Sequence, residues 1–142
     1  MNIAIFGPPG VGKSTIIDIA CQKGMRAFDL EKEGKTYTER KNAAQKLFKS
    51  YQKLSVLFNA ADLRINDFPQ DTILVLLLPP KETYDSRWHI RDSMYPDKLG
   101  QHEDKVYEYF RRNQSNFHLV LSDVINPHSI IEKIQQYIQP DK

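Results

Sequence analysis

A glycine-rich octapeptide near the start of the chain, Gly7 to Ser14, constrains the fold more than any other feature. Its residues, Gly-Pro-Pro-Gly-Val-Gly-Lys-Ser, satisfy the pattern G-x-x-x-x-G-K-[ST] of a phosphate-binding loop. The apolar run from Asn2 to Phe6 predicts a buried strand before it, and the stretch from about Gly12 to Lys23 predicts a helix after it. The loop therefore connects a strand to a helix, as phosphate binding requires.

This loop predicts binding of a nucleoside triphosphate, ATP or another NTP, together with Mg²⁺. Its glycines let backbone N–H groups turn toward the phosphates, and the helix N-terminus adds positive potential. Lys13 is expected to reach the β- and γ-phosphates, and the Ser14 hydroxyl is expected to ligate the metal. The residues expected to bind the nucleotide are Gly7, Pro8, Pro9, Gly10, Val11, Gly12, Lys13, Ser14 and Thr15.

Further apolar runs predict a parallel sheet with helices on both faces, a three-layer α/β fold. An amphipathic helix is expected from Thr38 to Leu54, a helix-loop-helix over residues 81–115, and a last helix from Pro127. Four more strands are predicted at Met25 to Leu30, Leu54 to Ala60, Thr72 to Leu78 and Phe117 to Leu121.

Size and composition favour one soluble domain spanning residues 1–142. A net charge of +2 gives no general case for binding nucleic acid or a membrane, so any electropositive site must be local. The single Cys21 cannot form an intramolecular disulfide, and the longest apolar run, Ile73 to Leu78, is too short to span a bilayer. A cytoplasmic location is the default expectation.

Three carboxylates are candidates for the metal and the acceptor. Asp29 and Glu31 alternate by two at a predicted strand end, so both are expected to face the same side, beside the loop. Asp62 follows the next apolar strand, where P-loop enzymes place a carboxylate that supports magnesium, and it competes with Asp29 for that role. For Glu31, an exposed acid that merely begins a loop is an equally good interpretation.

Two arginines after the fourth predicted strand are candidates for stabilising the transferred group. Arg87 and Arg91 are spaced i, i+4, which places both guanidinium groups on one helix face, able to clamp phosphate oxygens. The alternative is a solvated surface helix in which these arginines pair with Asp85 and Asp92.

The segment between the second and third predicted strands is locally basic, with seven Lys and Arg against three Glu between residues 31 and 53. Arg40 and Lys41 lie nearest the presumed cleft, and Arg64 could also meet an anionic acceptor. A solvated lysine-rich helix face is the alternative interpretation.

These motifs make the chain resemble the adenylate kinase-like P-loop kinases, which include nucleoside monophosphate kinases, shikimate kinase and gluconate kinase. The resemblance rests on the loop, Asp29-x-Glu31, the helical insert and Arg87-x-x-x-Arg91. It implies the strand order 2-3-1-4-5, a substrate-binding insert at about 31–53 and a lid at about 80–115. It also implies that Asp29 holds the magnesium shell and that Glu31 touches the phosphate acceptor.

One departure bears on the acceptor. Nucleoside monophosphate kinases carry Asp-Gly-Phe-Pro-Arg after the third strand, whereas residues 66–70 here read Asn-Asp-Phe-Pro-Gln. The expected function is phosphoryl transfer from Mg-ATP to a small acceptor, either a nucleotide, a nucleoside or another hydroxyl-bearing or anionic metabolite. The alternative is an ATP-binding regulatory or NTPase module that does not transfer phosphate. A small GTPase is disfavoured because the sequence has no Asn-Lys-x-Asp motif.

Overall fold

Strand β1 (Asn2–Phe6) is the centre of a five-stranded parallel sheet with the order β2-β3-β1-β4-β5. The computed structural model describes residues 1–86, 103–123 and 126–138. The other strands are β2 (Ala27–Asp29), β3 (Val56–Asn59), β4 (Ile73–Leu77) and β5 (Leu119–Leu121). This arrangement confirms the predicted strand order, and all four neighbouring pairs are parallel.

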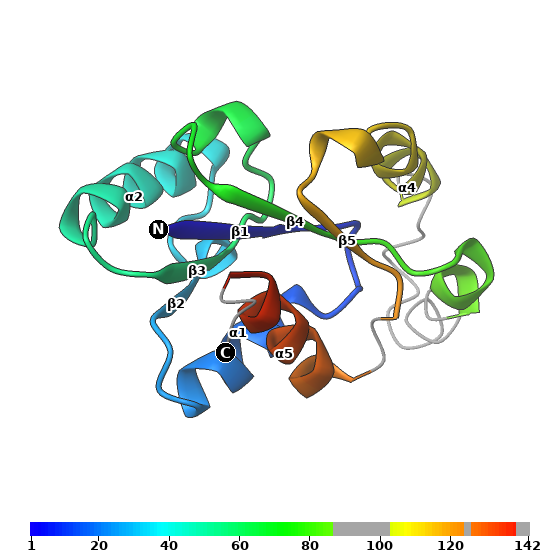
Figure 1. Ribbon diagram of the computed structural model, residues 1–142. Helices are drawn as coiled ribbons and strands as arrows, with labels where there is room; N and C mark the ends of the chain where they lie inside the picture. Colours follow the sequence, from blue (N-terminus) through cyan, green and yellow to red (C-terminus); the bar gives the residue numbers. More distant parts are fainter. Residues whose placement is uncertain (87–102, 124–125, 139–142) are drawn as a thin grey trace.

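Helices cover both faces of the sheet (Figure 1). On one face lie α1 (Lys13–Gln22) and α5 (Pro127–Ile138), which also contact each other. On the other face lie α2 (Tyr37–Ser50) and α4 (Glu103–Arg112). Short 3-10 turns connect the elements: η1 (Leu30–Lys32), η2 (Ile65–Asp67) and η3 (Gln114–Asn116). Residues 81–86 are also helical. The fold is therefore the predicted three-layer α/β architecture.

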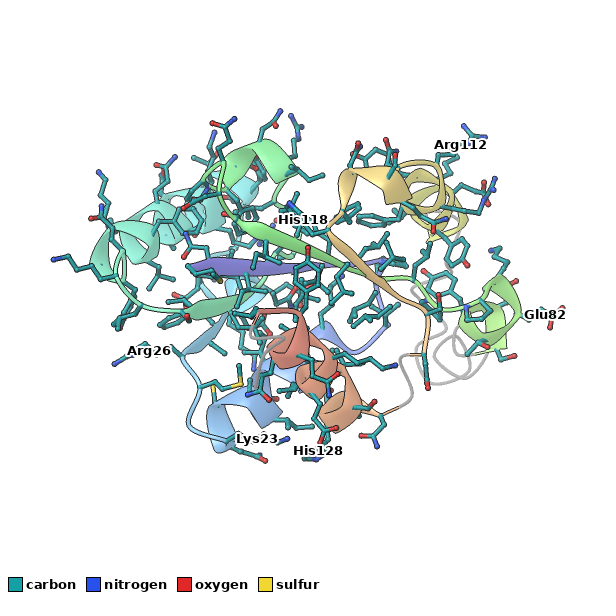
Figure 2. All side chains as sticks on the ribbon, viewed as in Figure 1. Lys23, Arg26, Glu82, Arg112, His118 and His128 are labelled. Atoms are coloured by element: carbon teal, nitrogen blue, oxygen red, sulfur yellow. The ribbon has the colours of Figure 1, made fainter. Side chains whose placement is uncertain are left out.

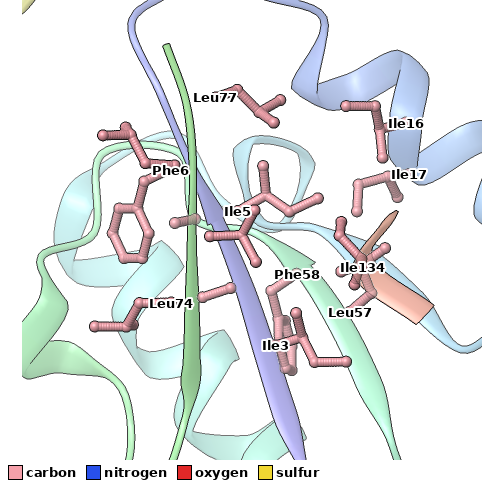
Figure 3. Close-up of a cluster of buried hydrophobic side chains, with 14 of the residues drawn as sticks. Ile3, Ile5, Phe6, Ile16, Ile17, Leu57, Phe58, Leu74, Leu77 and Ile134 are labelled. Atoms are coloured by element: carbon pink, nitrogen blue, oxygen red, sulfur yellow. The ribbon is translucent and has the colours of Figure 1, made fainter. Parts of the chain in front are cut away.

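Side chains of β1 alternate between the two helical layers because successive residues of a strand point to opposite faces. Ile3 and Ile5 lie on the side of Ile16, Ile17 and Ile134, which come from α1 and α5, as Figure 3 shows. On the opposite face the core is largely aromatic. The rings in contact there are Phe6 with Phe68 and Phe117, and Phe48 with Phe58 and Phe68. Both faces of the sheet are thus buried, which explains the nearly continuous apolar strands.

The α1 boundaries agree with the sequence-based expectation. Gly12 is the N-cap, and Gly24 adopts the left-handed conformation expected of a residue just past a helix C-terminus, with φ of 83°. The predicted helix from Thr38 to Leu54 is shorter in the structure because α2 ends at Ser50. Tyr51 then turns the chain toward β3, and its N–H still donates to Leu47.

No helix within the described ranges has the length and apolar character needed to cross a membrane.

Candidate nucleotide-binding site

The glycine-rich loop leaves the carboxyl end of β1 and enters α1. Gly10 and Gly12 have φ of 84° and 94°, a region that residues with a Cβ rarely occupy. Gly7 is needed for a different reason: a Cβ there would lie 2.8 Å from the Leu77 carbonyl oxygen and 3.0 Å from Val11 Cγ2. The glycines therefore let β1, β4 and the loop pack closely and let the loop turn into the helix.

Lys13, the first residue of α1, is buried, with 9% of its surface exposed. Its ammonium group donates to the Gly7 carbonyl oxygen and lies 3.5 Å from that of Pro8, so the loop folds around it. Burial lowers the pKa of Lys13 to about 8, while the charges of Glu31 and Asp29 act in the opposite direction. A triphosphate in the loop would compete with these two carbonyl oxygens for the Lys13 ammonium group.

Asp29 closes β2 and is buried beside the loop. Its Oδ1 accepts hydrogen bonds from the Asn59 side-chain amide at 2.9 Å and from the Glu31 backbone N–H at 3.1 Å. Its Oδ2 is buried and has no hydrogen-bond donor among the described residues. An unpaired buried carboxylate oxygen is costly, so it marks a position where a metal-bound water or a ligand would fit.

The unpaired Oδ2 of Asp29 fits a magnesium site, and so does the small number of protein oxygens near the loop. Mg²⁺ is usually held by one or two protein oxygens together with substrate phosphates and waters. In the described part of the chain, no three His, Cys, Asp or Glu side chains gather as a metal cluster. Ser14, one residue after Lys13, would supply a hydroxyl, and Asp29 would supply the carboxylate of such a sparse site.

Asp62 lies beyond the end of β3, which finishes at Asn59. Both of its carboxylate oxygens are engaged by Arg40, with Nε at 2.8 Å and the terminal nitrogen at 2.7 Å. This hydrogen bonding lowers the pKa of Asp62 and raises that of Arg40. The strand-end position that the sequence suggested for an acid is therefore taken by Asn59, and Asp62 joins α2 to the loop after β3.

The other residues expected at the acceptor side gather at the N-terminal turn of α2. Lys41 Nζ lies 3.6 Å from an Asp67 oxygen, and the Tyr37 hydroxyl donates to the same carboxylate. The Arg64 guanidinium lies 5.6 Å from the centre of the Tyr37 ring. Although burial raises the pKa of Asp67, its hydrogen bonds from Tyr37 and the Arg64 backbone and the nearby Lys41 charge lower it overall.

Glu31 connects the two sides of this region electrostatically. It is exposed on η1, two residues after Asp29. Its negative charge favours the charged form of Lys13 in the loop and of Arg40 in α2, so it raises the pKa of both residues. The other lysines of the insert are exposed: Lys46 and Lys49 on α2, and Lys32, Lys35 and Lys53 outside it. Figure 2 shows nitrogen-tipped side chains that project from the α2 region away from the sheet.

Arg87 and Arg91 lie outside the described residues. The segments on either side of residues 87–102 do meet: the rings of Tyr84 and Tyr107 stack with centroids 5.0 Å apart. The Tyr107 hydroxyl donates to the Pro79 carbonyl oxygen at 2.6 Å, and Lys81 Nζ lies over both rings. The end of β4 and α4 are therefore fixed to each other by buried aromatic contacts.

The central strand ends in a glycine-rich loop, and a buried lysine begins the next helix. These features define a P-loop protein. The sheet also has the strand order expected for P-loop kinases. The family model described as RNA helicase matches residues 3–73, half of the sequence, and the chain belongs to this family of P-loop proteins. The match begins in β1 and ends at the first residue of β4, so it contains the phosphate-binding loop. No curated protein matches the sequence significantly.

Solved structures of P-loop kinases share the fold over nearly the whole chain. A shikimate kinase from Acinetobacter baumannii, in complex with shikimate, is 22% identical, with a TM-score of 0.64 over 99% of this chain and 94% of that one. A gluconokinase from Sinorhizobium meliloti is 19% identical, with a TM-score of 0.58 over 92% and 86%. A deoxyadenosine kinase from M. mycoides is 19% identical, with a TM-score of 0.56 over 99% and 100%. At these identities the likeness establishes the fold.

Sequence reasoning missed three residues that organise this site: Asn59, Asp67 and Tyr37. In the sequence the predicted strand runs on to Ala60, which hides the position of Asn59 at the strand end. The contacts of Asp67 with Tyr37 and Lys41 join segments that are far apart in the sequence, so no local pattern indicates them. The signal that could have found Asn59 is a lone amide closing an apolar strand next to the loop-bearing strand.

Proposed function

We propose that this protein is a small kinase that uses Mg-ATP and transfers the γ-phosphoryl group to a small acceptor. The observation that carries the proposal is that a buried Lys13 in the loop feels the charge of a buried Asp29, one of whose carboxylate oxygens has no hydrogen-bond donor among the described residues. The likeness of the whole chain to small-molecule kinases supports it.

In this proposal Lys13 binds the β- and γ-phosphates, and backbone N–H groups of the loop hold the remaining phosphate oxygens. Ser14 and Asp29 hold the magnesium, which supplies charge neutralisation for the phosphates when it is bound. Asp62 was also a candidate ligand, but with both oxygens on Arg40 it would need to release that partner first. We therefore assign the metal role to Ser14 and Asp29.

The acceptor binds in this proposal over η1 and the first turn of α2, between Glu31 and Arg64. The acceptor hydroxyl oxygen bonds to the γ-phosphorus as the bond from that phosphorus to the bridging oxygen of ADP breaks. The hydroxyl proton leaves to a carboxylate, and we assign this role to Glu31, which is exposed. Arg40 and Lys41 shape this side through their ion pairs with Asp62 and Asp67, and Arg64 is the cation best placed to meet an acceptor anion.

Arg87 and Arg91 belong to the same proposal as residues that stabilise the transferred group. Replacing both with alanine should lower turnover by about 10³-fold while changing the Kd of ATP less than about threefold, because arginines of this type act mainly in the transition state. An equal loss of ATP binding and turnover would assign them to nucleotide binding instead. We further propose that residues 1–142 form one domain that acts in the cytoplasm. Its insert comprises residues 31–53 and its lid residues 80–115.

The direct experiment is a transfer assay with γ-labelled ATP against a panel of mononucleotides, nucleosides, sugars and small hydroxy acids. We expect one class of compound to become labelled, and we expect Lys13→Ala to abolish the labelling. An enzyme that binds ATP but labels no member of the panel, and whose ATP consumption no member accelerates, would contradict the kinase proposal.

The family match favours a second candidate, an NTPase module that hydrolyses ATP without an acceptor. This candidate is separated from the first by measuring ATP hydrolysis with and without single-stranded RNA. Stimulation of hydrolysis by RNA, with no acceptor labelled, would favour the NTPase. The near-neutral charge balance of the chain gives no broad basic surface for RNA, which is why we place this candidate second.

A further inference from the structure

We infer that Asn59 is a positioning residue that orients Asp29 for magnesium and so gives this site a single strand-end carboxylate. The inference rests on the proposed use of Mg-ATP. Asn59 is the last residue of β3 and is completely buried, with 0% of its surface exposed. It lies in register with Ile5 of β1 on one side and with Asp29 of β2 on the other, so it sits between the loop-bearing strand and the acid.

The two hydrogen bonds of the Asn59 carboxamide fix its orientation. Its Nδ2 donates to Asp29 Oδ1 at 2.9 Å, and its Oδ1 accepts from the Ala61 backbone N–H at 3.0 Å. Exchanging the amide nitrogen and oxygen would place a donor against the Ala61 N–H and an acceptor against the carboxylate. Only one of the two orientations satisfies both neighbours, so the amide cannot rotate freely.

The hydrogen bond from Asn59 also determines which carboxylate oxygen of Asp29 is left to face a metal ion. Oδ1 is occupied by Asn59 and by the Glu31 N–H, whereas Oδ2 has no donor among the described residues. The amide therefore holds the carboxylate in one rotamer and leaves a single lone oxygen for the metal shell. Hydrogen-bonded partners of this kind set the orientation of metal-binding groups and thereby affect metal affinity.

Asn59 also supports the turn that follows β3. Ala61 has φ of 53°, an unfavourable left-handed conformation for a residue with a Cβ, and its N–H is the donor to Asn59. An acid at position 59 could accept the same bond, but it would place a second negative charge against Asp29. The neutral amide satisfies the turn and the carboxylate together.

The test measures metal and nucleotide binding separately, with a fluorescent ATP analogue. In Asn59→Ala we expect the affinity for the analogue in EDTA to stay within about twofold, while the Mg²⁺ concentration for half-maximal enhancement of binding rises about tenfold or more. The Asp29→Ala variant should show the same metal defect, and the double variant should be no worse than Asp29→Ala alone, because Asn59 acts through Asp29.

Thr72→Val is the matched control, since Thr72 is also a buried polar residue, lies directly before β4, and has a hydroxyl with no partner among the described residues. This variant should leave the metal dependence unchanged. Additive metal defects in Asn59→Ala and Asp29→Ala, or an unchanged magnesium midpoint in folded Asn59→Ala, would overturn the inference.

A second variant covers the case in which Asn59→Ala does not fold. Asn59→Asp has nearly the same volume and still accepts from Ala61, but it replaces the donor to Asp29 with a like charge. We expect Mg²⁺ to raise the melting temperature of its ATP complex by more than it raises that of the wild type, because the cation offsets the new repulsion. If Mg²⁺ raises the two melting temperatures equally, the inference about Asn59 is overturned and the proposed function is not. A wild-type protein that binds no nucleotide would overturn the proposed function and this inference with it.

Discussion

Arg40 of α2 donates two hydrogen bonds to the carboxylate of Asp62 in the loop after β3, at 2.8 and 2.7 Å. The pair joins a candidate acceptor-binding residue to a candidate metal ligand, 22 positions apart in the sequence. Its geometry is the bidentate form that arginine makes best with a carboxylate. The pair therefore links α2 to the loop after β3.

This pairing predicts a measurable coupling in stability. Asp62 is half-exposed, so solvent screens the interaction, and a double-mutant cycle of Arg40→Ala and Asp62→Ala should give about 0.5–1 kcal/mol of coupling. Because the pKa of Asp62 is lowered in the folded protein, this contribution is present at neutral pH and lost as the pH falls through the folded-state value. Urea unfolding at pH 7 and pH 3 measures both effects, and additive single variants at pH 7 would contradict the pairing.

Gly7→Ala should disturb both stability and nucleotide binding. The added Cβ would meet the Leu77 carbonyl oxygen at 2.8 Å, and backbone atoms cannot move aside cheaply. We expect a loss of about 1–3 kcal/mol in the free energy of unfolding, together with weaker ATP binding.

Gly24→Ala is the control for this substitution. Its φ of 83° also disfavours alanine, but its Cβ would meet nothing within 4 Å and it lies at the far end of α1. This control should cost about 1 kcal/mol in stability and leave ATP affinity unchanged. Equal effects of both substitutions on ATP affinity would argue against a loop-specific role for Gly7.

Tyr107→Phe should destabilise the contact between α4 and the end of β4. The substitution removes a 2.6 Å hydrogen bond and leaves the buried Pro79 carbonyl without that donor, at a cost of about 1–2 kcal/mol. Tyr109→Phe, on the same helix but 58% exposed, should have no measurable effect. Thermal unfolding of the two variants compares them directly, and equal melting temperatures would show that the Tyr107 hydroxyl contributes nothing.

Nucleotide affinity should depend on pH through Lys13. Burial lowers the pKa of this lysine to about 8, so above that pH the free protein holds it increasingly neutral. A triphosphate needs the charged form, so ATP affinity should fall by up to about tenfold per pH unit above 8. Calorimetry between pH 7 and 9.5 tests this, with the weaker binding of Lys13→Met expected to be flat across the range. A wild-type affinity that is also flat would contradict it.

The sequence predicted the sheet because its strands are built mainly of apolar residues, as a parallel sheet buried on both faces requires. The P-loop was predicted because its chemistry is local: glycines, lysine and serine act within a few residues of one another. Asn59 and Asp29 are different, since their contact joins residues 30 apart in the sequence and appears only once β2 and β3 pair in register. The pairing of Asp62 with Arg40 was hidden for the same reason.

Calorimetric titration of Mg-ATP into the wild type and into Lys13→Ala tests the central claim most directly, because the proposed chemistry begins with a triphosphate in the loop from Gly7 to Ser14. We predict that the wild type binds with one site per chain and that Lys13→Ala binds at least about tenfold more weakly, or not at all, while remaining folded. Equal affinity in the two proteins, or no binding by the folded wild type, would contradict the account.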